Sequence, residues 1–73
     1  MIIELNVNKL MGMLVQLYDR DIKLVAYRKT LEGEDIVLLE GNEEDLFKLH
    51  NDFSEQRDMD LLREEFEDKI VAK

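Results

Sequence analysis

The chain has 73 residues, of which 45% are hydrophobic, and it carries a net charge of −8 at pH 7 with no Cys, no Pro and one His. These numbers exclude disulfide and structural-zinc staples within a domain that buries only about 60% of its unfolded surface. The negative charge argues against direct binding of nucleic acid or of an anionic membrane, because both are polyanions. We expect one domain over residues 1–73, a basic protein surface as partner, and a homodimer that buries leftover apolar surface.

The sequence shows no signal for a membrane or for export. No apolar run approaches the roughly 20 residues of a membrane-spanning helix. The first residues lack the basic segment and apolar run of a signal peptide. A cytoplasmic protein is therefore expected, in the host cytoplasm if the protein is encoded by a phage.

Residues 2–7 alternate β-branched or apolar residues with polar ones in their second half, which predicts a strand. Asn8 can then cap a helix, and apolar residues at spacings of three and four predict a short helix over about 9–18. Gly12 weakens that helix by about 1 kcal/mol relative to Ala. A strand over residues 13–18 is the competing interpretation.

A hairpin is predicted over residues 22–40. Strand formers fill 22–29, a turn with Gly33 follows, and 35–40 is again apolar and β-branched. Strict alternation in the first strand predicts that one of its two faces is more apolar than the other. That face consists of Ile22, Leu24, Ala26 and Arg28. With residues 2–7, the hairpin would form a small antiparallel sheet.

Two acidic helices are predicted after the hairpin. Asn42 precedes three acids that suit the positive end of a helix dipole, so a helix is expected over about 43–54. A second acid-capped helix is expected over about 58–71. Spacings of three and four residues predict the core face of each helix. In the first helix it consists of Leu46, Leu49, His50 and Phe53, and in the second of Met59, Leu62, Phe66 and Ile70.

The two helices are predicted to be separated by a bend near residues 54–57. At 100° per residue, the step from Leu46 to Leu62 leaves their apolar faces about 160° apart on one continuous helix. A bend lets both faces meet one core. The sequence therefore predicts an α+β fold, in which a small antiparallel sheet packs with two acidic C-terminal helices.

Catalytic and metal-binding patterns are missing from the sequence. A Ser–His pair could come only from His50 and Ser54, and nothing supplies an oxyanion hole, so we expect a partly buried, hydrogen-bonded His50 and no enzyme. The acids around residue 20 lack the later Gly and Glu of a calcium loop. No glycine pattern resembles a phosphate loop. No metal or cofactor is expected.

The acids form rows on the predicted helices. Residues 32–68 hold 15 acidic and 3 basic residues. Like charges one helical turn apart destabilise a helix by a few tenths of a kcal/mol, yet few basic residues are interspersed, apart from Lys48. The candidate partner-binding residues are Glu43, Glu44, Asp52, Glu55, Asp60, Glu64, Glu65, Glu67 and Asp68.

Two interpretations of these rows compete. In one, the acids only keep a small protein soluble. In the other, rigid rows of carboxylates imitate a phosphate backbone and occupy a site built for nucleic acid, with strong salt dependence as a consequence. Phe47 and Leu61, off the core faces, would be exposed and could anchor a dimer or a partner.

A short, Cys-free, strongly acidic chain with acids in rows on its terminal helices resembles the small phage-encoded inhibitors that mimic DNA. These include the dimeric inhibitor that sits in the DNA channel of the bacterial sliding clamp. The resemblance covers size, charge and layout and contains no diagnostic motif, so it assigns no residue a role. It implies a partner that handles nucleic acid, such as a sliding clamp or a polymerase.

The sequence thus supports a non-enzymatic inhibitor or regulator whose acidic helices enter a basic groove. The alternative is an acidic adaptor or antitoxin-like subunit that binds through apolar helix faces and uses its charge only for solubility.

Overall fold

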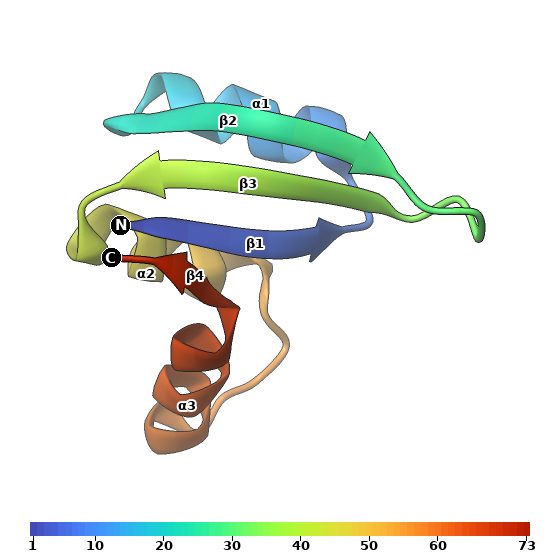
Figure 1. Ribbon diagram of the computed structural model, residues 1–73. Helices are drawn as coiled ribbons and strands as arrows, with labels where there is room; N and C mark the ends of the chain where they lie inside the picture. The colour runs from blue at the N-terminus through green and yellow to red at the C-terminus, as the bar shows by residue number, and fades with distance from the viewer.

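The computed structural model describes residues 1–73 and confirms an α+β fold with four strands and three helices (Figure 1). The sheet is built largely from β-branched and leucine residues, and the acidic segments form the last two helices. In chain order the elements are β1 (Ile2–Val7), α1 (Leu10–Tyr18), β2 (Ile22–Lys29), β3 (Asp35–Gly41), α2 (Glu43–Phe53), α3 (Met59–Lys69) and β4 (Ile70–Ala72).

The four strands form one antiparallel sheet in the order β2-β3-β1-β4. The first strand of the chain is therefore an inner strand, paired with β3 from Ile2 opposite Glu40 to Val7 opposite Asp35. This βαββαβ order is the split βαβ arrangement of ferredoxin-like domains, with α3 as an additional helix before the last strand. The arrangement leaves β2 and β4 as the two edges.

One face of the sheet carries the core. Alternate residues of β1 and β3 point to this face. In Figure 1, α1 and α2 lie behind the sheet, and α3 lies beyond the β4 edge. No helix of the protein is long and apolar enough to cross a membrane. The core cluster consists of Ile3, Leu5, Val7, Met13, Ile22, Val37, Leu39, Leu46, Leu49 and Phe66.

The structure confirms several local predictions. Residues 10–18 are helical, so the competing strand over 13–18 is wrong. The bend is confirmed, since α2 ends at Phe53 and α3 begins at Met59. The Asn42 side chain caps α2 by accepting a hydrogen bond from the Asp45 backbone N–H at 2.8 Å. The Asp58 carboxylate caps α3 in the same way.

Two boundaries and one strand register differ from the sequence prediction. The last helix ends at Lys69, and Ile70–Ala72 form β4, because the β1 edge offers backbone partners that a longer helix could not use. Lys9, and not Asn8, is the N-cap of α1, without a side-chain bond. A register shift between Leu24 and Ala26 sets them opposite Leu39 and Leu38, hence on opposite faces of the sheet.

Burial differs from prediction mainly at the ends of the last two helices. Phe53 is the last residue of α2 and Met59 the first of α3. These residues are 38% and 59% exposed, because both positions lie where the helices leave the core. Phe47, predicted to be exposed, is half-buried and packs edge-on against Phe66 with ring centroids 5.3 Å apart. Leu61 is exposed, as predicted.

The hairpin turn depends on one glycine. Gly33 has φ of +86°, in the left-handed region where a side chain is strained. We expect Gly33→Ala to lower the free energy of unfolding by about 1 kcal/mol. Gly12→Ala, in α1 where the new methyl group makes an ordinary van der Waals contact with Lys9 Cβ at 3.9 Å, should raise it by up to about 1 kcal/mol. Urea denaturation of both variants measures this; equal effects would contradict the role of the turn.

Candidate functional site

The acids of α2 are largely neutralised within the molecule. Glu43 binds Arg63 at 3.2 Å, and Glu44 binds Lys48 at 3.2 Å. Asp52 binds Arg20, which follows α1, at 2.5 Å. Glu55, predicted to extend this row, lies beyond the end of α2 on the exposed connection to α3. Three of the four α2 acids therefore serve as ion-pair partners inside the protein, and the fourth, Asp45, accepts a hydrogen bond from the Asn42 side-chain amide at 2.8 Å.

The acids of α3 behave differently. Four of them are exposed and form no ion pair, and we call them the α3 row: Asp60, Glu64, Glu67 and Asp68. Arg63 could have paired along the helix but instead reaches Glu43 and stacks over the Phe47 ring, 4.2 Å from its centroid. The charge of the α3 row is thus left uncompensated.

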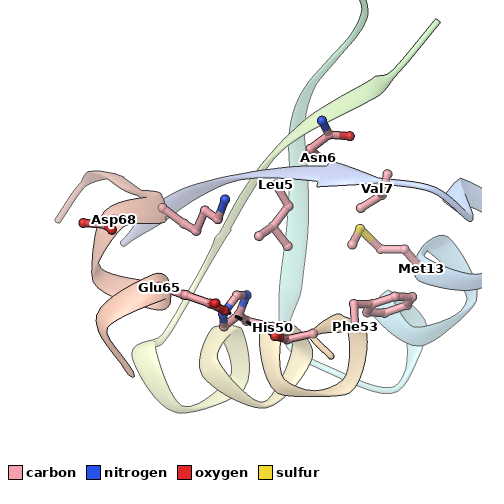
Figure 2. A pocket seen from close by; sticks show the side chains of 10 residues that line it. Leu5, Asn6, Val7, Met13, His50, Phe53, Glu65 and Asp68 are labelled. Atoms are coloured by element: carbon pink, nitrogen blue, oxygen red, sulfur yellow. Dashed lines mark hydrogen bonds and ion pairs between the residues drawn. The ribbon is translucent and has the colours of Figure 1, made fainter. Parts of the chain in front are cut away.

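Glu65 does not join the α3 row, because its side chain turns inward. Its Oε2 accepts a hydrogen bond from Ser54 Oγ at 3.3 Å and lies 3.8 Å from His50 Nε2. These groups line a cleft of about 350 Å³ between β1, α2 and the end of α3 (Figure 2). We call it the His50 cleft; it is lined by Leu5, Asn6, Val7, Met13, His50, Phe53, Ser54, Glu65, Asp68 and Lys69.

His50 is buried, as predicted, but its Nε2 has no hydrogen-bond partner, so the expected hydrogen bond is absent. The Glu65 oxygen at 3.8 Å is too distant to supply one. Burial lowers the pKa of His50 below its ordinary value of 6.5, although the Glu65 carboxylate acts in the opposite direction; Lys69 lowers it further. The Ser54 hydroxyl binds Glu65 and not His50, so no Ser–His pair forms.

The lowered pKa makes stability depend on pH. Because the unfolded state takes up a proton on His50 before the folded state does, the free energy of unfolding should fall as pH drops below about 7, until the folded pKa is passed. His50→Leu should flatten this slope between pH 7 and about pH 5.5, above the ordinary range of carboxylates. Urea denaturation across this range measures it. An unchanged slope in the variant would contradict the assignment to His50.

An apolar surface that the sequence prediction missed lies between α1 and the sheet edge. An open groove of about 360 Å³, which we call the α1/β2 groove, is lined by Leu14, Leu17, Tyr18, Ile22 and Leu24. The signal was present in the sequence: seven of the nine residues of α1 are apolar, more than one core-facing stripe requires. Without the order of the strands, the sequence does not show which surface the additional apolar residues of α1 form.

No family model, curated protein or solved structure matches this chain. No group of three His, Asp or Glu side chains is arranged to hold a metal ion. The geometry therefore defines three features: the uncompensated α3 row, the His50 cleft and the α1/β2 groove.

Proposed function

We propose that this protein is a non-enzymatic inhibitor or regulator that inserts the α3 row into a basic, nucleic-acid-binding groove of another protein. A sliding clamp or a polymerase has the required kind of surface. The observation that carries the proposal is the contrast between the two acidic helices. Three of the four α2 acids are paired at 2.5 to 3.2 Å, whereas four of the five α3 acids form no ion pair.

The charge spacing of the α3 row supports phosphate mimicry. Asp60 and Asp68 are eight residues apart in an α-helix, so the row is about 12 Å long. Four carboxylates over that length give about one charge per 4 Å, against one per 3.4 Å along one strand of DNA. A groove lined with Lys or Arg for a phosphate backbone would meet a similar charge density.

The placement of these charges also costs stability. Glu67 and Asp68 lie in the last turn of α3, where the negative end of the helix dipole repels them. Asp60 with Glu64, and Glu64 with Asp68, repel each other at spacings of four residues. A protein that needed charge only for solubility could place it at favourable positions, as at the start of α2. This pattern favours a binding role.

The alternative function, an acidic adaptor or antitoxin-like subunit, gains support from one observation. The apolar faces of α2 and α3 are used in the core, but α1 and β2 leave the α1/β2 groove open. An adaptor would therefore bind its partner at that groove and leave the α3 row free.

A capture experiment from bacterial lysate separates the two functions. The wild type is compared with a row variant carrying Asp60→Asn, Glu64→Gln, Glu67→Gln and Asp68→Asn. The matched control neutralises three paired α2 acids, in Glu43→Gln, Glu44→Gln and Asp52→Asn. Mimicry predicts capture of nucleic-acid-binding proteins at low salt, release by added duplex DNA, and loss in the row variant only. Undiminished capture by the row variant at low salt would exclude mimicry.

A further inference from the structure

We propose that the protein forms a two-fold homodimer through the α1/β2 groove and the free edge of β2. In this arrangement a second copy adds its own β2 in antiparallel orientation, and the two four-stranded sheets become one. The inference goes beyond the proposed function, because the interface uses none of the acidic residues that the function requires.

The first observation is the character of the β2 edge. β2 is an outer strand of eight residues that pairs only with β3, so one row of its backbone N–H and C=O groups faces solvent. Soluble proteins usually protect such edges with charged residues, Pro, a β-bulge or a covering element. β2 has no Pro, carries its charges at Lys23, Arg28 and Lys29, and has the register shift between Leu24 and Ala26. The four central residues, Leu24–Tyr27, are uncharged and apolar or aromatic, and every one of them is exposed. The centre of the edge is therefore exposed and apolar, and a second strand that pairs there must accommodate the register shift at Val25.

The second observation is the apolar surface beside that edge. The α1/β2 groove is lined only by apolar or aromatic residues, and Tyr18 at its rim is 92% exposed. Val25 and Tyr27 continue the surface along β2, each 47% exposed. Together with Leu24, these side chains present roughly 300 to 400 Å². When the backbone that would pair and the flanking charged side chains are added, the buried area approaches the roughly 800 Å² per partner of a stable interface.

The third observation, charge, favours a second copy as the occupant. β2 and the acidic α3 lie at opposite edges of the sheet (Figure 1), so a dimer about β2 keeps the two α3 rows as far apart as the molecule allows. Contact through any surface nearer α3 would bring two strongly acidic regions together. Closed two-fold pairing is also the commonest arrangement of homo-oligomers.

Charge also argues against an acidic peptide on this edge. Arg28 already pairs with Glu4 and Lys29 with Asp35, both at 3.7 Å, which leaves Lys23 as the one unpaired basic residue of β2. In an antiparallel pair centred on Val25, Lys23 faces Tyr27 of the partner subunit and no like charge. The strand is thus compatible with its own copy and has little net attraction for acids.

Sedimentation and amide hydrogen exchange test the dimer. The wild type should sediment as a dimer at about 10 µM, at both low and high salt, and the β2 amides should be protected from exchange. Tyr18→Glu and Val25→Glu should each produce a folded monomer by sedimentation and circular dichroism, because both side chains are exposed. Exchange of the β2 amides should increase in these monomers while that of β1 is retained.

Two control variants match the exposure of the tested residues. Leu31→Glu, fully exposed in the hairpin turn, corresponds to Tyr18→Glu, and Val71→Glu, 53% exposed on the opposite edge strand, corresponds to Val25→Glu. Both should remain dimeric. A monomeric wild type, or a dimer that only Val71→Glu disrupts, would overturn the proposal. An association that high salt dissolves would also overturn it, since that indicates contact between the basic and acidic ends. Loss of lysate capture with an intact dimer would affect only the proposed function.

Discussion

Phe66→Ala is expected to lower the free energy of unfolding by about 3–5 kcal/mol. The Phe66 side chain is fully buried on α3 and contacts the rings of Phe47 and His50, with centroids 5.3 and 5.9 Å away. Removing it leaves a cavity where α2, α3 and the sheet meet. A domain of 73 residues has a total stability of about 4–11 kcal/mol, so this one substitution removes from about a quarter to all of it.

Urea denaturation followed by circular dichroism measures this loss. Phe53→Ala is the matched control, because the same atoms are deleted at the end of α2, where the residue is 38% exposed. Its cost should be well below that of Phe66→Ala, since less apolar contact is lost. A Phe53→Ala variant that is as unstable as Phe66→Ala would contradict the placement of α3 against the core.

Neutralising the α3 row should weaken binding to the captured partner by roughly 30- to 1,000-fold at low salt, at about half to one kcal/mol for each of four charges. The logarithm of the affinity should also depend less steeply on the logarithm of salt concentration, because fewer counterions are exchanged on binding. Titration of the purified partner at several salt concentrations measures both quantities.

Loss of binding in the row variant would not reflect unfolding. The substitutions remove repulsion within α3 and at its C-terminal turn, so the variant should be at least as stable as the wild type in urea. The α2 control should instead lose some stability, because Arg20, Lys48 and Arg63 lose their partners. Similar loss of partner affinity in both variants would show that net charge, and not the α3 row, governs binding.

Local signals predicted much of this fold. The turn with Gly33, the caps at Asn42 and Asp58, and the opposed apolar phases of residues 46 and 62 each depend on neighbouring residues, and each is confirmed. These features gave the hairpin, both acidic helices and the bend between them. The exposed acids of α3 also follow from helical spacing alone.

Features that depend on distant contacts were not predicted. Ile70 has helical spacing from Phe66, and only the free edge of β1 turns it into β4. The register shift at Leu24 and Ala26 depends on the pairing of β2 with β3. The difference between paired α2 acids and the unpaired α3 row required knowing that Arg20 and Arg63 reach across to α2. The α1/β2 groove became visible only with the strand order.

The strand order has a consequence for how the chain folds. Only β2 and β3 are neighbours in both sequence and sheet, whereas Ile3 of β1 pairs with Leu39 on one side and Ile70 on the other. Closing such long loops is entropically slow, so we expect the hairpin to form first, β1 to dock next and β4 to join last. Gly33→Ala should therefore slow folding, whereas destabilising changes in β4 should mainly speed unfolding.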